Sequence, residues 1–135
     1  MVELHSWITI RETYEICEDA DDGRVIQNIK EVIQGLRYID VSVKVTNGNY
    51  YIEFSLYTNH FSADVKEYLN FFSEIGKIAK GSYGLLYLYN DEDATYCNEF
   101  QIWRLSRGEV RKFDDKILSP FVPTVEDFDA ELNQG

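Results

Sequence analysis

The side chains that could perform acid–base chemistry are abundant carboxylates, but their spacing does not form a catalytic site. The densest group, Asp91, Glu92 and Asp93, falls on a predicted turn. Carboxylates on a turn are usually solvated, so an acid–base pair there is the less favoured interpretation. A hydrolase built from scattered carboxylates would need two acids with perturbed pKa values in one cleft, which a sequence does not show. We therefore predict that the protein is not an enzyme.

Metal-ligating residue types are few and widely separated. His5 and His60 fall in different predicted elements and lack the HxxxH or HExxH spacing by which two histidines bind one zinc ion. Cys17 and Cys97 lie outside any CxxC motif. The sequence does not decide whether these two cysteines form a disulfide, but they do not resemble the disulfide framework of a small secreted protein. We expect no metal and no cofactor.

The segment 81–84, Gly-Ser-Tyr-Gly, has the GxxG spacing of loops that clamp a nucleic-acid backbone. Gly81 is better explained as the C-cap of the preceding predicted helix. The chain also carries 24 acidic and 13 basic residues, a net charge of −11, which repels phosphate groups. A basic RNP-type motif, typical of RNA-binding sheets, is missing. We therefore expect no nucleic acid and no anionic membrane as partner.

The chain of 135 residues is predicted to form a single domain over 1–135, with an acidic, proline-containing tail over 114–135 that packs on or near the sheet. The first residues have no positive region followed by a long apolar run, and no stretch reaches the length of a membrane span. We expect a cytoplasmic protein. The sequence does not indicate its oligomeric state.

Hydrophobic periodicity predicts the elements that position these residues. Apolar residues alternate over 4–10, as in a strand, and recur with helical spacing from Val25 to Leu36, as in a one-sided helix of about 14 residues. A second helix is predicted to start at Ser62 and to stop at Gly81. Short strands are predicted over 85–89, 99–105 and 109–113, with a turn at 107–108 between the last two.

The clearest local signal is a β-hairpin over 39–56. Apolar and polar residues alternate on both sides of Asn47-Gly48, a dipeptide that favours a type I′ turn because both positions accept positive φ. This turn pairs every apolar residue with another apolar one: Val45 with Tyr50, Val43 with Ile52, Val41 with Phe54 and Ile39 with Leu56. Turn chemistry and hydrophobic pattern therefore predict the same register.

The resulting order, β-α-β-β-α-β followed by a β-hairpin, predicts an α+β fold. Two βαβ units of this kind make a ferredoxin-like split βαβ sandwich, with two helices on one face of a mainly antiparallel sheet. The added C-terminal hairpin would extend this sheet beside the fourth strand.

Alternation along the strands also predicts which residues lie on the sheet face that the helices leave open. They form an unusually aromatic set: His5, Trp7, Tyr51, Glu53, Tyr57, Tyr87, Tyr89, Gln101 and Trp103. Trp and Tyr combine a large contact area with one polar group and are enriched in protein-binding hot spots. In the alternative arrangement the tail folds back and buries this face with Leu118, Phe121, Val122 and Phe128. Both arrangements can hold together, each over part of the face.

Several segments together resemble the immunity protein 7 family, which is found beside bacterial polymorphic toxins. They run nearly end to end: His5-Ser6-Trp7-Ile8, Ile10-Arg11-Glu12-Thr13, Asn59-His60, Gly81-Ser82-Tyr83-Gly84-Leu85-Leu86-Tyr87, Asn98 with Phe100 and Trp103, Arg107-Gly108, and Leu118-Ser119-Pro120 with Pro123. The sequence departs from the family pattern at Ser6, where a glycine is expected, and at Phe121, where a cysteine is expected. The resemblance implies a protein that protects its own cell by binding and blocking a cognate toxin domain.

An acidic, aromatic surface would suit a toxin with a basic active site, such as a nuclease. The expected toxin-binding residues are the aromatic anchors Trp7, Tyr51, Tyr87, Tyr89 and Trp103 with His5, and the charge partners Glu12, Glu53, Asp91, Glu92 and Asp93. Two alternatives stay open. One is a ferredoxin-like regulatory domain that binds a small molecule, and the other is a DNA mimic whose carboxylates imitate phosphates.

Overall fold

The computed structural model describes residues 1–16, 18–37 and 40–127. Nine elements follow one another in this part of the chain: β1 (Val2–Ile10), α1 (Asp22–Gln34), β2 (Ser42–Thr46), β3 (Asn49–Thr58), α2 (Ala63–Ile78), β4 (Tyr83–Asn90), β5 (Gln101–Ser106), β6 (Glu109–Asp114) and the short α3 (Phe121–Thr124). The predicted strands and the two long helices are therefore all present, with ends that differ by a few residues.

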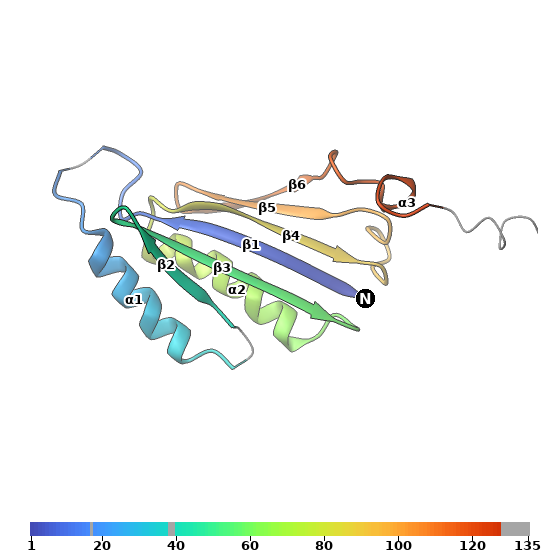
Figure 1. Ribbon diagram of the computed structural model, residues 1–135, viewed down its shortest axis with the longest axis horizontal. Coiled ribbons are helices and arrows are strands. Elements are labelled where there is room, and N and C mark those ends of the chain that lie inside the picture. Colours follow the sequence, from blue (N-terminus) through green and yellow to red (C-terminus); the bar gives the residue numbers. More distant parts are fainter. Residues whose placement is uncertain (17, 38–39, 128–135) are drawn as a thin grey trace, which may run out of the picture.

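The strands form one six-stranded antiparallel sheet in the order β2-β3-β1-β4-β5-β6. Both α1 and α2 lie on the same face of this sheet (Figure 1). The predicted α+β class and the placement of the two helices on one face are confirmed. The hairpin of β5 and β6 extends the sheet beside β4, also as predicted.

Two tight turns set the register at the two edges of the sheet. Asn47 and Gly48 have φ of 53° and 78°, the positive values that a type I′ turn requires. Val45 pairs with Tyr50 as predicted, and the ladder ends where Ser42 meets Glu53, so the predicted pairing of Val41 falls outside β2. The predicted pairing of Ile39 with Leu56 is not tested, because Ile39 lies outside the described residues. The turn at 107–108 likewise has two positive φ angles, 52° and 76°.

The two long helices differ in how their ends are capped. At α1 the carboxylate of Asp21 accepts a hydrogen bond from the backbone N–H of Arg24 (3.0 Å). The predicted stop of α2 at Gly81 is wrong, because the helix ends at Ile78 and is capped by Ala79. Gly81 is needed for a different reason: a Cβ at this position would collide with the backbone of Thr13.

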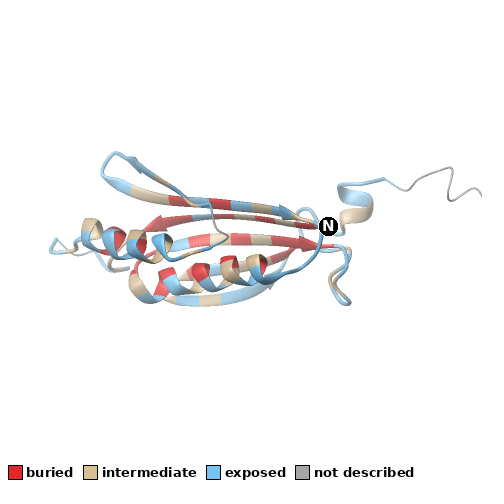
Figure 2. Ribbon diagram, turned by 90° about the horizontal axis from the view of Figure 1, so that it is seen from below, coloured by how far each residue is buried: buried red, intermediate tan, exposed pale blue. Residues whose placement is uncertain are grey.

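The core lies between the sheet and the two helices, where Figure 2 shows buried residues along both. Its largest fully buried side chains come from both helices and from the strands and include Tyr68, Phe72, Ile26, Leu4, Ile8, Ile52 and Leu86. Ser6 is a buried polar residue of this layer. The hydroxyl of Ser6 is buried and has no hydrogen-bond partner among the described residues. No helix in the described ranges is long and apolar enough to cross a membrane.

Candidate protein-binding face

The sheet face opposite α1 and α2, called the open face below, is arranged around β1. Antiparallel pairing places Trp7 between Glu53 on β3 and Leu85 on β4. One pair further along, His5 lies between Ser55 and Tyr87. Because side chains alternate across a strand, these residues and their i±2 neighbours share the open face. The structure thus brings together His5, Trp7, Tyr51, Glu53 and Tyr87, as the sequence predicted.

Aromatic rings on the open face are exposed and contact neighbouring rings edge to face. The exposed fraction is 66% for Tyr57, 44% for Tyr83 and 42% for Trp7. Tyr57 meets the His5 ring edge to face, with centroids 5.4 Å apart, and Tyr83 meets Trp7 in the same way at 6.2 Å. Such pairs contribute roughly 0.5–1.5 kcal/mol beyond burial. The open face therefore presents preformed aromatic contacts to solvent.

The predicted position of Trp103 is wrong. Trp103 pairs with Leu86 and Gln101 pairs with Leu88, so both side chains lie on the helix-covered face rather than the open one. The Trp103 side chain is partly buried against the core. In its place β5 presents Ile102 to the open face, beside Tyr87. The connection over 91–100 is not a tight turn, so the sequence does not determine the register of β5 on β4. A shift of one residue in this register moves every side chain of β5 to the opposite face of the sheet.

The predicted anchor Tyr89 lies on the open face but is covered by the tail. The ring of Phe121 stacks on Tyr89 with centroids 4.3 Å apart and planes at 12°, and Tyr89 retains 4% exposure. Its hydroxyl donates to the carbonyl of Cys97 (3.0 Å). Burial, followed by the nearby carboxylates of Asp91 and Glu126, raises the pKa of the Tyr89 phenol. Phe128, which was also predicted to cover the open face, lies outside the described residues.

A set of hydrogen bonds holds the tail against the end of the sheet. The Asn98 amide accepts from the backbone N–H of Val122 (2.8 Å) and donates to the carbonyl of the same residue (3.1 Å). The buried carboxylate of Asp115 accepts from the N–H groups of Ile117 and Leu118 and from the Ser119 hydroxyl, at 2.8–3.0 Å. Burial alone would raise the pKa of Asp115, but these hydrogen bonds outweigh it and lower the pKa.

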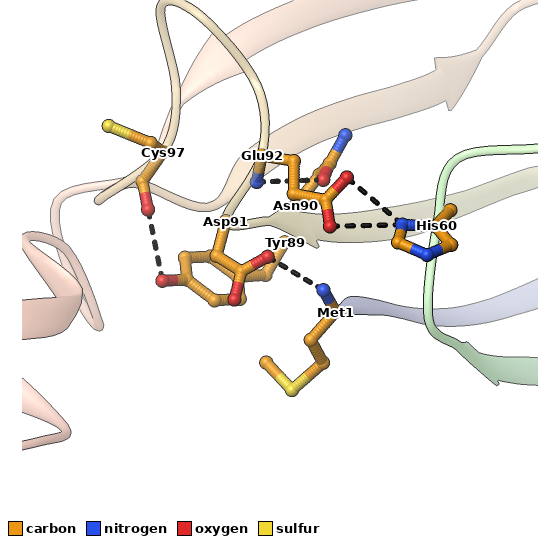
Figure 3. A network of polar contacts seen from close by, with 7 residues as sticks. All are labelled: Met1, His60, Tyr89, Asn90, Asp91, Glu92 and Cys97. Atoms are coloured by element: carbon orange, nitrogen blue, oxygen red, sulfur yellow. Dashed lines mark hydrogen bonds and ion pairs between the residues drawn. The ribbon is translucent and has the colours of Figure 1, made fainter.

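The carboxylates of the turn after β4 are engaged by their neighbours (Figure 3). Asp91 binds the amino group of Met1 (2.7 Å), and Glu92 contacts the ring of His60 (3.0 Å). Asp93 accepts from the backbone N–H groups of Thr95 and Tyr96, both at 2.8 Å, which lowers its pKa. The hydrogen bonds of Asp93 stabilise the turn, whereas the two exposed side-chain pairs add little.

The predicted charge partners are not gathered at one place. Figure 1 shows the segment after β1, which contains Glu12, at one end of the sheet and the connection after β4 at the other. Glu12 is paired with Arg24 of α1. Glu53 alone among the predicted acids lies within the open face, where it binds the ammonium group of Lys44 (2.8 Å). The structure therefore separates the predicted acidic set into three groups.

Two hollows indent the open face, and His5 lines both. The first, called the apolar hollow, has a volume of about 260 Å³ and is lined chiefly by Tyr87, Phe100, Ile117 and Leu118, with Glu3, His5 and Asp115 at its margin. The second, called the polar hollow, measures about 360 Å³ and is lined by His5, Ser6, Trp7, Asp40, Ser42, Glu53, Phe54 and Ser55. In the polar hollow His5 lies opposite Ser55, and the His5 ring nitrogen contacts the carboxylate of Glu3 at 2.8 Å. Within the described ranges, no group of three His, Cys, Asp or Glu residues is positioned to hold a metal ion.

Sequence reasoning missed several open-face residues: Tyr83, Ile102, Arg104 and Phe113. Extending the alternation of β4 by two residues would have found Tyr83. The other three required the pairing of β4 with β5, which no local motif encodes. The guanidinium of Arg104 lies 4.6 Å from the centroid of the Phe113 ring, so this exposed cation makes a cation–π contact.

Comparison with known proteins yields one match. The family model described as immunity protein 7 matches residues 1–127, nearly the whole chain. A search of curated proteins found no match. A search of solved structures also found none. This chain therefore belongs to the immunity protein 7 family, and membership implies an immunity protein that acts against a toxin.

Proposed function

We propose that this immunity protein neutralises its cognate toxin domain by docking the open face over the toxin active site. The observation that carries the proposal is the set of exposed rings of Trp7, Tyr57 and Tyr83, each of which packs edge to face on a neighbouring ring. Exposed Trp and Tyr rings offer a large area for burial by a partner and are the residue types enriched in binding hot spots. Tyr51 and Tyr87 extend the same surface on either side of β1.

The charge of the chain supports a basic partner. A net charge of −11 attracts a positively charged protein over a distance of about 10 Å at 0.1 M salt and accelerates encounter. An active site that binds a phosphate backbone, as in a nuclease, has this positive charge. Steering by the whole chain does not require that Glu12 and Asp91 act at the interface, because long-range attraction depends on total charge.

The proposal also includes the fold type and the cellular location of the protein. The first four strands with α1 and α2 form a ferredoxin-like unit, an assignment that the order β2-β3-β1-β4 supports. The protein acts in the bacterial cytoplasm as one domain over 1–135, in which Phe121 of the tail stacks on Tyr89 of β4. The tail then limits the free part of the open face to the region around Trp7 and His5.

Copurification with the product of the adjacent upstream gene tests the proposal. We expect a one-to-one complex that abolishes the toxic activity, and replacement of Trp7 and Tyr57 by alanine should weaken it by at least about 100-fold, the loss of two hot-spot residues. Phe61→Ala is the matched control, because Phe61 is also exposed but precedes α2 outside the sheet. Titration at two salt concentrations separates aromatic docking from DNA mimicry, which would lose far more affinity in salt.

Absence of a complex with a harmless neighbouring gene product would contradict the proposal. The alternative, a regulatory domain that binds a small molecule, would then be tested by thermal-shift screening. A hollow of about 370 Å³ between α1 and α2, lined in part by Val32, Leu36 and Phe71, is the place where such a molecule would bind. A metabolite that raises the melting temperature of the parent protein, but not of Phe71→Ala, would support that alternative.

A further inference from the structure

The polar hollow combines groups that bind a planar cation. Trp7, Glu53 and Ser42 form one row across β1, β3 and β2, since Glu53 pairs with both of the other residues. His5 and Ser55 form the next row, and Asp40 lies at the mouth. An aromatic wall, carboxylates and serine hydroxyls thus surround a space of about 360 Å³. We propose that this hollow receives an arginine side chain of the toxin, an inference that rests on the proposed function.

The carboxylate of Glu53 is available for exchange. Its present partner, Lys44, is 2.8 Å away, but the side chains of Glu53 and Lys44 are 50% and 55% exposed. Ion pairs between exposed side chains contribute little, because solvent screens them and both side chains lose freedom in forming them. A guanidinium that enters the hollow can therefore displace the Lys44 ammonium from Glu53. Asp40 adds a second negative charge at the mouth, so the hollow favours a cation over a neutral guest.

Arginine fits the hollow better than lysine does. A guanidinium is planar, donates in a fork to a carboxylate and a neighbouring hydroxyl, and stacks on an indole ring. Trp7 offers this ring, and Tyr83 contacts it edge to face. A lysine ammonium is a compact charge and gains less from the ring and from the row of Glu53 and Ser42.

The apolar hollow, by contrast, lacks a free acceptor for an arginine side chain. Its one buried carboxylate, Asp115, already accepts three hydrogen bonds from Ile117, Leu118 and Ser119. Its other acid, Glu3, binds the ring nitrogen of His5 at 2.8 Å. Most of its remaining lining is hydrocarbon. An arginine would lose water there without gaining a free acceptor, so the cation belongs in the polar hollow.

The first experiment uses the isolated protein and two probes. N-acetyl-arginine amide is titrated while amide and Trp7 indole N–H signals are followed by NMR, and N-acetyl-norleucine amide serves as the uncharged probe of similar length. We expect saturable shifts at Trp7, Glu53 and Ser55 with the arginine probe alone. Glu53→Gln should weaken its binding about tenfold, the loss of one charge-assisted hydrogen bond. Lys44→Met should strengthen it about two- to fivefold, because the competing ammonium is gone.

Glu31→Gln is the matched control, because it removes the same charge from an exposed position on α1. It should leave the affinity for the arginine probe unchanged. The inference is overturned if the norleucine probe shifts the same signals, if the arginine probe shifts none, or if Glu31→Gln weakens binding as much as Glu53→Gln does. The last result would indicate attraction by total charge rather than a site.

A second experiment, with the toxin, distinguishes this inference from the proposed function. Glu53→Gln should lower toxin affinity about tenfold, while Glu31→Gln should leave it near the parent value. A toxin that binds both variants equally well would overturn the arginine assignment and leave the immunity function intact. A toxin that does not bind the parent protein would overturn the docking proposal, while the probe titration would still decide what the hollow binds.

Discussion

The helix-covered face and the open face consist of alternate residues of the same strands, yet they differ in composition and exposure. On β1, Leu4 and Ile8 point to the helices and have exposed fractions of 0% and 1%. Trp7, the residue before Ile8, points the other way and is 42% exposed. Strand geometry determines that neighbours point apart, but it does not determine which of them is buried. That depends on what packs against each face.

The open face is also divided within itself. At one end Phe121 covers Tyr89, and hydrogen bonds from Asn98 hold this cover in place. At the other end Trp7 and Tyr83 stay exposed. On the helix-covered face the strand side chains are mainly aliphatic, such as Leu4 and Ile8, and they pack with rings of α2 such as Phe72. The exposed part of the open face instead carries rings with a polar group, for which water is an acceptable neighbour. One sheet thus supplies both a core face and a solvent-exposed aromatic face.

The largest expected effect comes from Gly84, where the backbones of β4 and β1 approach closely. A Cβ at Gly84 would collide with the backbone of Trp7 and Ile8, so β1 and β4 cannot remain paired around a larger residue. Gly84→Val should cost more than about 5 kcal/mol, enough to abolish the folded state of a typical domain. Circular dichroism and thermal melting measure this. Gly35→Ala, with only ordinary contacts, is the control and should melt like the parent.

The second prediction compares two consecutive residues. Ile8→Ala leaves a cavity in the core and should lower the free energy of unfolding by roughly 2–5 kcal/mol. Trp7→Ala should lower it by about 1 kcal/mol, the scale of its pair with Tyr83, but should reduce toxin affinity strongly. Urea unfolding and toxin titration of both variants provide the two measurements. Equal losses of stability would show that the open face is part of the core.

A third, smaller effect concerns the anchoring of the tail and depends on pH. The pKa of Asp115 is lowered in the folded protein, so its contribution to stability is present above the unfolded value of about 4 and is lost as pH falls through the folded pKa. Asp115→Asn should cost about 2 kcal/mol at pH 7, because one amide cannot accept all three hydrogen bonds. Urea unfolding at pH 7 and pH 3 should show the two proteins converging at the lower pH.

The smallest expected effect is a gain. The Ser6 hydroxyl is buried in the helix-covered layer without a hydrogen-bond partner among the described residues. Ser6→Ala removes this unsatisfied group and should raise stability by about 1 kcal/mol. The melting temperature measures the gain. A loss of stability would reveal a polar partner for the hydroxyl.

Local sequence signals predicted the parts of the fold that short segments determine. Asn47-Gly48 and Arg107-Gly108 each adopt the two positive φ angles of a tight turn, and these turns set the registers of β2 with β3 and of β5 with β6. The helical spacing from Val25 onward likewise predicted which side of α1 is buried. In each case the energetic preference lies within about 15 residues of chain, so the sequence contains it directly.

The sequence by itself therefore determined the element types, the alternation along each strand, the aromatic character around Trp7 and the family. Only the tertiary structure decided how strands distant in sequence pair and what covers them. Trp103 faces the helices because β5 pairs with β4 in a register that no turn specifies, and one residue of slip exchanges the two faces. Tyr89 is buried because Phe121, far along the chain, packs on it. Burial is a property of contacts between distant segments, and alternation within one strand does not contain it.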